Sequence, residues 1–529
     1  MEMTRMRRFR LWIMSAVLFL GSSSAVFAVP TIHETWQGDW DRIDRTDAVS
    51  ESQLVGDIVN VLQNMCPSDF IMGAASAEYQ ILGQASLGHS HMAHGESVMP
   101  ATDFSGDACG GWDQHFKDIY LLEKCSLNGY RFSIDWSALQ PKQGEWDSER
   151  LQHYVDFCKE LRRRNIKVMA TMHHFVHPQW FEELGAFERS ENSVYFVSFC
   201  QKIFNELAPY VDQWCTINEP GIYVFQSYMR GVFPPFKSVT FPGLPWVGLR
   251  EHWAPCKQAG YCNIALAGTV LRNLLTAHVM VYQACHEIWG KKIAALSMKE
   301  TELTQHELDW LTLAEKPSIG FVHQYLTFRN FHSKNNMLGR FEWSIARVLN
   351  NWISDAVIGF FDRGEFSFTG AKKLNITVPE AKKSFDFVGL NYYSVVSFNL
   401  FAGGPDYYDK DIRTDMPYGI YAEGLFHAIK DLARLHKPIY ITENGVADAS
   451  DTVRNTWIKR HFWAIAKALE SGCDVRGFFY WSLMDNWEWD MGYGKKFGLY
   501  HVDFQSAELT RTLRPGSFIY KAIAEQLQK

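Results

Sequence analysis

The sequence predicts an α/β protein, a single (β/α)8 TIM barrel with long loops on its active face. Short β-rich runs alternate with helical patterns along nearly the whole chain, and no internal sequence repeat divides it. At roughly 150 residues per domain, 529 residues would allow three or four domains, but one large barrel fits as well. An open, doubly wound sheet is the alternative fold.

Eight runs are predicted as strands, and most are bounded by polar residues or glycine and followed by a loop and a helical pattern. They are Phe70–Ala75, Tyr130–Asp135, Lys167–Met172, Gln213–Ile217, Lys292–Ser297, Phe385–Leu390, Pro438–Thr442 and Val475–Trp481. Leu151–Arg164 illustrates the helices, because its apolar residues recur on one face. The stretches Arg230–Cys262 and Glu300–Asp386 are expected to be elaborated loops over the active face, with some helix inside.

The N-terminus predicts a secretory signal over residues 1–28. Four arginines precede the short apolar run Leu11–Leu20, and small residues follow it. An uncleaved membrane anchor is the alternative, although this run is shorter than the roughly 20 residues of a membrane span. We therefore expect export to the periplasm, the medium or an endomembrane lumen. Residues 29–64 form an acidic leader whose structure the pattern leaves open, and residues 65–529 form the catalytic domain.

Composition and charge narrow the possible partners. The chain is 47% apolar with a formal charge of −7. Losing four arginines and one glutamate with the signal brings the charge to −10, so no basic field favours nucleic acid or, after signal removal, a membrane. The ten cysteines are compatible with disulfides in an oxidising compartment, and Cys256–Cys262 is the best pair. Most others, such as Cys158 and Cys200, fall in helical patterns and are expected to be buried thiols.

Six of the eight predicted strands are followed by polar or aromatic residues, at the end of the barrel where such folds keep their sites. These residues are Gln80, His173, His174, Asn218, Glu219, Asn391, Tyr392, Tyr393, Glu443, Asn444 and Trp481. Two of them are glutamates, which turns do not especially favour. Paired carboxylates across a pocket are what hydrolysis of a glycosidic bond requires.

Two of these strand ends carry recognisable motifs, Thr216–Pro220 (TINEP) and Ile441–Gly445 (ITENG). They resemble the catalytic signatures of glycoside hydrolase family 1, the β-glucosidase family. Further segments match that family in the same order: Phe70–Gln80 (FIMGAASAEYQ), Tyr130–Trp136 (YRFSIDW), Gly389–Tyr393 (GLNYY), Trp481–Trp489 (WSLMDNWEW) and Tyr493–Leu499 (YGKKFGL). The resemblance covers about residues 66–525, and the ordered set is specific although each motif alone is weak.

The resemblance implies a retaining double displacement without cofactor or metal. Glu443 would be the nucleophile, and Glu219 the acid that protonates the departing oxygen and then the base that activates water. Arg131 and Tyr393 would hydrogen-bond the nucleophile, and Asn218 would meet the sugar 2-hydroxyl. A retaining pair needs its carboxyls about 5–5.5 Å apart.

The resemblance also implies a pocket for the non-reducing sugar. Its residues would be Gln80, His174, Asn391, Trp481, Glu488, Trp489 and Phe497. Relatives acting on 6-phosphorylated sugars lack the Glu488–Trp489 pair and carry a Ser/Lys/Tyr set for phosphate, so an unphosphorylated sugar is expected here. One departure is His174-Phe175-Val176, where the family's His-Trp-Asp segment has an indole, which leaves the sugar preference open.

The sequence thus predicts a retaining O-glycosidase that releases β-D-glucosyl, galactosyl or fucosyl residues from a small or oligosaccharide β-glycoside. A transglycosidase with a sugar acceptor, or a catalytically silent sugar-binding protein on the same barrel, are the alternatives. The oligomeric state is left open. His89, His91 and His94 follow the first strand; H-x-H-x-x-H can bind a metal, but a solvated His-rich rim is the favoured interpretation.

Overall fold

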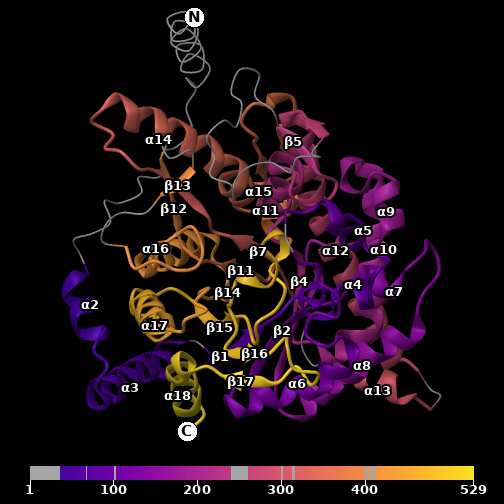
Figure 1. Cartoon of the computed structure of the whole chain (residues 1–529). Coiled ribbons are helices and arrows are strands. Elements are labelled where there is room, and N and C mark those ends of the chain that lie inside the picture. The colour runs from indigo at the N-terminus through magenta and orange to yellow at the C-terminus, as the bar shows by residue number, and fades with distance from the viewer. Residues whose placement is uncertain are drawn as a thin grey trace, which may run out of the picture.

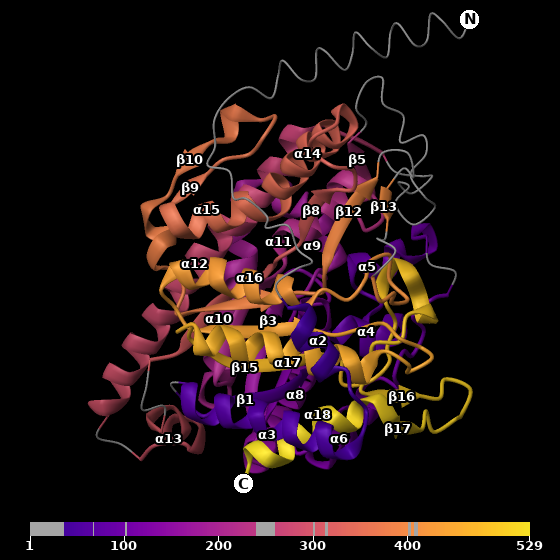
Figure 2. The ribbon, with the colours of Figure 1, turned by 90° about the vertical axis from the view of Figure 1, so that its left-hand side faces the viewer.

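The computed structural model describes residues 36–66, 68–100, 103–239, 260–299, 302–312, 316–399, 404–406 and 411–529. The predicted signal, residues 1–28, lies outside them. Eight parallel strands close into one barrel in the order β1-β15-β14-β11-β7-β4-β3-β2, surrounded by helices (Figures 1 and 2). The barrel strands are β1 (Ile71–Ala75), β2 (Gly129–Ser133), β3 (Lys167–His173), β4 (Gln213–Asn218), β7 (Ser318–Gln324), β11 (Phe387–Asn391), β14 (Ile439–Asn444) and β15 (Val475–Trp481). The predicted fold class is confirmed, and the open sheet is excluded.

The helices fill the connections between these strands. They are α4 (Glu78–Leu87), α5 (His91–Gly95), α6 (Trp112–Lys124), α7 (Trp136–Leu139), α8 (Ser148–Arg163), α9 (Gln179–Glu183), α10 (Ser193–Leu207), α11 (Pro220–Val224), α12 (Ile264–Ser297), α13 (Gln305–Leu311), α14 (Met337–Asn350), α15 (Ala356–Arg363), α16 (Ala422–Leu432), α17 (Arg454–Glu470) and α18 (Phe518–Leu527). The predicted apolar face of α8 is confirmed, since its apolar positions are buried.

The predicted fifth strand, Lys292–Ser297, is wrong. These residues form the last turns of α12, and the fifth barrel strand is β7. The run Ile293–Leu296 is apolar enough to resemble a buried strand, but its alanines and leucine favour a helix, and α12 continues through it. Consequently Glu300–Asp386 is not a single loop, because this range contains the barrel strand β7.

The described part of the predicted leader, which begins at residue 36, packs against the helices of the barrel. Helices α2 (Gln37–Ile43) and α3 (Ala48–Met65) lie against α17 and α18. Leu54, Ile58 and Leu62 of α3 are buried at this contact, following the apolar periodicity of one helical face. Figure 1 shows α2 and α3 on the same side of the molecule as α17 and α18.

Small sheets lie in the loops between the barrel strands and in the segment after the last barrel strand. They pair β8 (Thr327–Asn330) with β12 (Val395–Asn399), β12 with β13 (Gly404–Asp406), β9 (Glu365–Phe366) with β10 (Ile376–Thr377), β16 (Tyr500–Val502) with β17 (Arg511–Leu513), and β5 (Lys237–Val239) with β6 (Gly260–Cys262). The predicted elaboration after the fifth strand is therefore present in residues 325–386, where β8, α14 and α15 follow β7.

Helix α12 is long and apolar enough to cross a membrane by length and composition alone. However, 61% of its most apolar 18-residue segment is buried inside the protein, and the helix packs against α10 and α11. Its apolar composition is therefore explained by its place in the barrel's outer layer.

Nine cysteines lie in the described residues, and all nine are free thiols. Cys158 and Cys200 are buried, as predicted. Cys262 is also free, and its thiol donates to the Asn263 carbonyl oxygen at 3.2 Å, so the structure does not support the predicted Cys256–Cys262 bridge. Cys256 itself lies outside the described residues.

Candidate active site

The predicted catalytic residues converge at the carboxyl ends of four barrel strands. Arg131 lies on β2, Asn218 ends β4 with Glu219 directly after it, Asn391 ends β11, and Glu443 lies near the end of β14. Because parallel strands of a closed barrel end at the same rim, side chains distant in sequence meet here.

Glu443 accepts hydrogen bonds on both carboxylate oxygens. Arg131 donates from Nη1 to Oε1 at 2.6 Å, and the Tyr393 hydroxyl donates to Oε2 at 2.8 Å. Arg131 is fully buried, so its charge is compensated by this carboxylate. Two donors, one of them cationic, therefore fix the orientation of the Glu443 carboxyl.

The electrostatic environment of Glu219 differs from that of Glu443. Its side chain is buried, and burial together with the nearby Glu443 raises its pKa well above the ordinary value. Its partner is Asn391, which donates from Nδ2 to Oε1 at 2.6 Å. Burial beside a second carboxyl thus favours the protonated form of Glu219, the form that a general acid requires.

The backbone at Glu219 is held in a sparsely populated conformation. Its φ is +42°, in the left-handed region that non-glycine residues rarely adopt. The Glu219 amide donates to the Val322 carbonyl oxygen of β7 at 3.0 Å, and Pro220 begins α11 directly afterwards. Strain of this kind persists where the surroundings determine the conformation, and it is common at functional sites.

Asn218 links the surroundings of the two carboxyls. Its Oδ1 accepts from Arg131 Nη2 at 2.7 Å and from Asn391 Nδ2 at 3.2 Å, and its Nδ2 donates to His174 Nε2 at 3.2 Å. Thr442 adds a contact that sequence analysis missed, since its hydroxyl donates to Asn391 Oδ1 at 2.6 Å. Its place beside Glu443 in the ITENG motif is the signal that could have pointed to it.

The residues predicted to bind the sugar lie beside this network. Gln80 donates from Nε2 to Glu488 Oε2 at 3.0 Å and to Asn486 Oδ1 at 3.2 Å. Gln80 Oε1 and His174 Nδ1 are buried and have no hydrogen-bond partner in the described part of the chain. Unpartnered buried polar atoms of this kind suit sugar hydroxyls. Burial raises the pKa of Glu488 to about 8.

Aromatic rings pack against one another among these residues. The His174 ring stacks against two buried indoles, with its centroid 5.9 Å from the ring centroid of Trp481 and 6.2 Å from that of Trp489. The Phe497 ring packs edge-on against the Tyr393 ring, with 5.9 Å between the ring centroids, so it lies next to the hydroxyl that donates to Glu443. Phe175, which stands where the family has an indole, lies 5.5 Å from Trp489.

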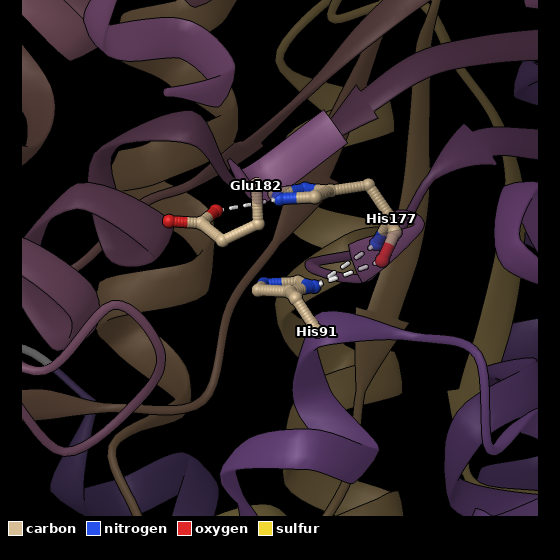
Figure 3. A group of neighbouring side chains, drawn as sticks. All are labelled: His91, His177 and Glu182. Atoms are coloured by element: carbon tan, nitrogen blue, oxygen red, sulfur yellow. Dashed lines mark hydrogen bonds and ion pairs between the residues drawn. The ribbon is translucent and has the colours of Figure 1, made fainter. Parts of the chain in front are cut away.

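The expected solvated histidine rim is only partly correct. His89 and His94 are exposed, but His91 is buried beneath the loop that follows β3. The error arose because His91 faces the interior at the start of α5, whereas His89 and His94 face solvent. Sequence analysis did not single out His177, against which the His91 ring lies (Figure 3).

A closed barrel that holds two glutamates among sugar-compatible side chains defines the class of glycoside hydrolases. A family model, Glycosyl hydrolase family 1, matches residues 62–528, and the chain belongs to this family. Curated relatives include 6-phospho-beta-galactosidases of Staphylococcus epidermidis and Staphylococcus aureus (strain COL), each 29% identical over 520 residues and covering 87% of this chain and 98% of the relative.

Solved structures with the same fold include a beta-glycosidase from Pyrococcus horikoshii. It is 28% identical with a TM-score of 0.69, and the match covers 87% of this chain and 95% of that one. A beta-glucosidase from Exiguobacterium marinum has a TM-score of 0.70 over 87% of this chain and 99% of that one, and at 23% identity it supports the fold alone.

Proposed function

We propose that this enzyme is a retaining β-glycosidase that hydrolyses terminal non-reducing β-D-glucosyl residues, and also galactosyl or fucosyl residues, from O-glycosides. One observation carries the proposal: two buried glutamates have different environments. Glu443 is paired with Arg131 and Tyr393, whereas burial and the nearby Glu443 raise the pKa of Glu219. Retaining glycosidases require this division between nucleophile and acid.

The proposed reaction has two displacements. A Glu443 oxygen attacks the anomeric carbon as the bond to the leaving oxygen breaks, and the Glu219 proton passes to that oxygen. A glycosyl ester on Glu443 results. Glu219, now ionised, takes a proton from water, the hydroxyl attacks the anomeric carbon, and the ester bond breaks to restore the Glu443 carboxylate.

Asn218 is proposed to bind the sugar 2-hydroxyl. Its amide is fixed on both ends, by Arg131 at Oδ1 and by His174 at Nδ2, so it cannot rotate freely away from the pocket. A preorganised group that contacts this hydroxyl stabilises the transition state more than the ground state.

The Tyr393 hydroxyl is expected to support the nucleophile. Tyr393→Phe removes one donor from Glu443 Oε2 and leaves the Arg131 contact in place. We expect kcat/KM for aryl β-glucosides to fall on the order of 10²-fold, the typical effect of losing one preorganised donor. A loss below about threefold in steady-state kinetics would contradict this role for Tyr393.

The sugar is proposed to be unphosphorylated, although the staphylococcal relatives are named for a 6-phosphorylated substrate. Glu488 and Gln80 form the polar wall of the pocket, and burial already disfavours ionisation of Glu488. A protonated carboxyl offers a phosphate dianion no positive charge, and an ionised one would repel it.

We therefore expect kcat/KM for 4-nitrophenyl β-D-galactoside to exceed that for its 6-phosphate by on the order of 10²-fold, equivalent to about 2.7 kcal/mol. Both substrates share a leaving group, so the comparison isolates the phosphate. A preference for the 6-phosphate would overturn the proposed substrate class while leaving the mechanism intact.

The direct test is nitrophenol release from 4-nitrophenyl β-D-glucoside, galactoside and fucoside. Free sugar should be measured alongside, because hydrolysis releases both products equally, whereas transfer to a sugar acceptor leaves free sugar below nitrophenol. No turnover of any β-glycoside by the folded protein would favour the silent sugar-binding alternative.

We also propose that the chain is exported. The arginines before Leu11–Leu20 and the small residues after it support a cleaved signal. The N-terminal sequence of the protein purified from its source should then begin at Val26 or Val29. An intact chain starting at Met1 in the membrane fraction would instead support the uncleaved anchor.

A further inference from the structure

We propose that Glu96 is a positioning residue for sugar binding, which fixes Trp489 and Gln80 through Tyr79. The inference rests on the proposed function, in which Trp489 and Gln80 contact the sugar. Glu96 begins the short helix η1 (Glu96–Val98), in the loop between α5 and α6 and 17 positions after Tyr79. It lies outside the sequence motifs from which the sugar-binding residues were predicted.

The Glu96 side chain is buried and accepts three hydrogen bonds. The hydroxyls of Tyr79 and Ser105 both donate to Oε1, and the Ser105 amide donates to Oε2 at 3.0 Å. Burial and the neighbouring Glu96 raise the pKa of Tyr79, so its hydroxyl keeps the proton that this contact requires. A buried carboxyl without such donors would destabilise the fold, so the positions of Glu96 and Tyr79 are fixed jointly.

Ser105 anchors Glu96 to two other parts of the protein. Its hydroxyl accepts from the Gln84 amide of α4 at 2.8 Å, and its carbonyl oxygen accepts from the Tyr493 hydroxyl at 2.5 Å. Tyr493 lies in the same short helix as Trp489, η11 (Trp489–Gly494). The contacts of Glu96 therefore lead back, on this second side, to the segment that begins with Trp489.

Tyr79 connects Glu96 to the proposed sugar-binding residues. Its ring lies parallel to the Trp489 indole, with 6.2 Å between the centroids and an interplanar angle of 7°, and it meets the Trp487 ring edge-on at 5.8 Å. Aromatic pairs at these distances favour particular mutual orientations. The next residue, Gln80, donates to the Trp487 carbonyl oxygen at 2.9 Å and to Glu488 Oε2 at 3.0 Å. A displaced Tyr79 would therefore disturb both the aromatic and the polar contacts to the sugar.

The test compares variants of the full chain in steady-state kinetics. Glu96→Met keeps a side chain of similar length but accepts none of the three hydrogen bonds, and Tyr79→Phe removes only the hydroxyl. Both substitutions should raise KM for 4-nitrophenyl β-D-glucoside about tenfold, because a buried donor or acceptor loses its partner. They should change kcat less than threefold, because contacts that bind substrate and transition state alike affect KM. Asp107→Asn, an exposed carboxyl of the same loop, should leave both constants unchanged.

The double variant separates a joint role from two independent ones. Because Glu96 acts through the Tyr79 hydroxyl, KM of the double variant should lie within about twofold of that of Glu96→Met. The proposal is overturned if the two effects multiply, if both single variants keep KM within twofold of the wild type, or if the loss is confined to kcat. The melting temperature reports folding, and Tyr79→Phe tests the proposal even where Glu96→Met does not fold.

Failure of the proposed function gives a different result. A wild type that turns over no β-glycoside contradicts that function, and binding of D-glucose, followed by tryptophan fluorescence, then replaces KM in the same comparison. Wild-type turnover together with an unchanged KM in Glu96→Met and Tyr79→Phe contradicts only the role of Glu96. A folded wild type that neither turns over a β-glycoside nor binds glucose overturns both.

Discussion

Replacing Glu443 by glutamine is expected to lower kcat for 4-nitrophenyl β-D-glucoside by about 10⁴- to 10⁶-fold, the scale of effect seen when a covalent nucleophile is removed. Glutamine preserves the size of the side chain, but its amide is a poor nucleophile and cannot form the glycosyl ester. The two hydrogen-bond donors, Arg131 and Tyr393, remain in place.

The same substitution leaves the buried Arg131 without a compensating charge. Breaking a buried ion pair by removing one partner typically costs 3–5 kcal/mol, so the melting temperature of the variant should also fall. Calorimetric measurement of inhibitor binding shows how much of the variant is folded. It therefore separates the loss of stability from the loss of the chemical step. Residual activity within tenfold of the wild type, free of wild-type contamination, would exclude Glu443 as the nucleophile.

Replacing Glu219 by glutamine is expected to have an effect that depends on the leaving group. For 4-methylphenyl β-D-glucoside, whose phenolate needs protonation, kcat/KM should fall by about 10²- to 10⁴-fold. For the 2,4-dinitrophenyl glucoside it should fall less than tenfold, because that phenolate leaves without a proton. Water would then lack its base, so the glycosyl-enzyme should accumulate and give a burst of dinitrophenol.

The pH dependence of kcat/KM gives a second test of the role of Glu219. Glu219 must be protonated for the first displacement, so wild-type kcat/KM should fall as pH rises through its raised pKa. This basic limb should disappear in Glu219→Gln, whereas Glu149→Gln, an exposed glutamate of α8, should leave the profile unchanged. An equal loss on both aryl glucosides would contradict the acid/base role.

Much of the fold was predictable because the barrel strands are short apolar runs with polar residues at one end. The prediction of a strand at Lys292–Ser297 failed because apolar composition alone cannot distinguish a strand from a turn of a buried helix. The true strand β7 ends in Gln324, so it has the kind of polar end found after most of the predicted strands.

The candidate site was predictable as a set of residues but not as a geometry. Arg131 and Glu443 are 312 positions apart, and only closure of the barrel brings their side chains to 2.6 Å. The contact of Thr442 with Asn391 and the stacking of His91 on His177 depend likewise on how neighbouring loops fold together. No spacing in the sequence encodes these contacts.

The most direct test of the central claim is to trap the glycosyl-enzyme. A 2-deoxy-2-fluoro-β-D-glucoside with a dinitrophenyl leaving group slows the second displacement, because fluorine disfavours the oxocarbenium-like transition state. Mass spectrometry of the digested protein should find one added fluoroglucosyl group on the peptide that contains Glu443. An unlabelled peptide in an enzyme that turns over β-glucosides, or a label on another carboxylate, would contradict Glu443 as the nucleophile.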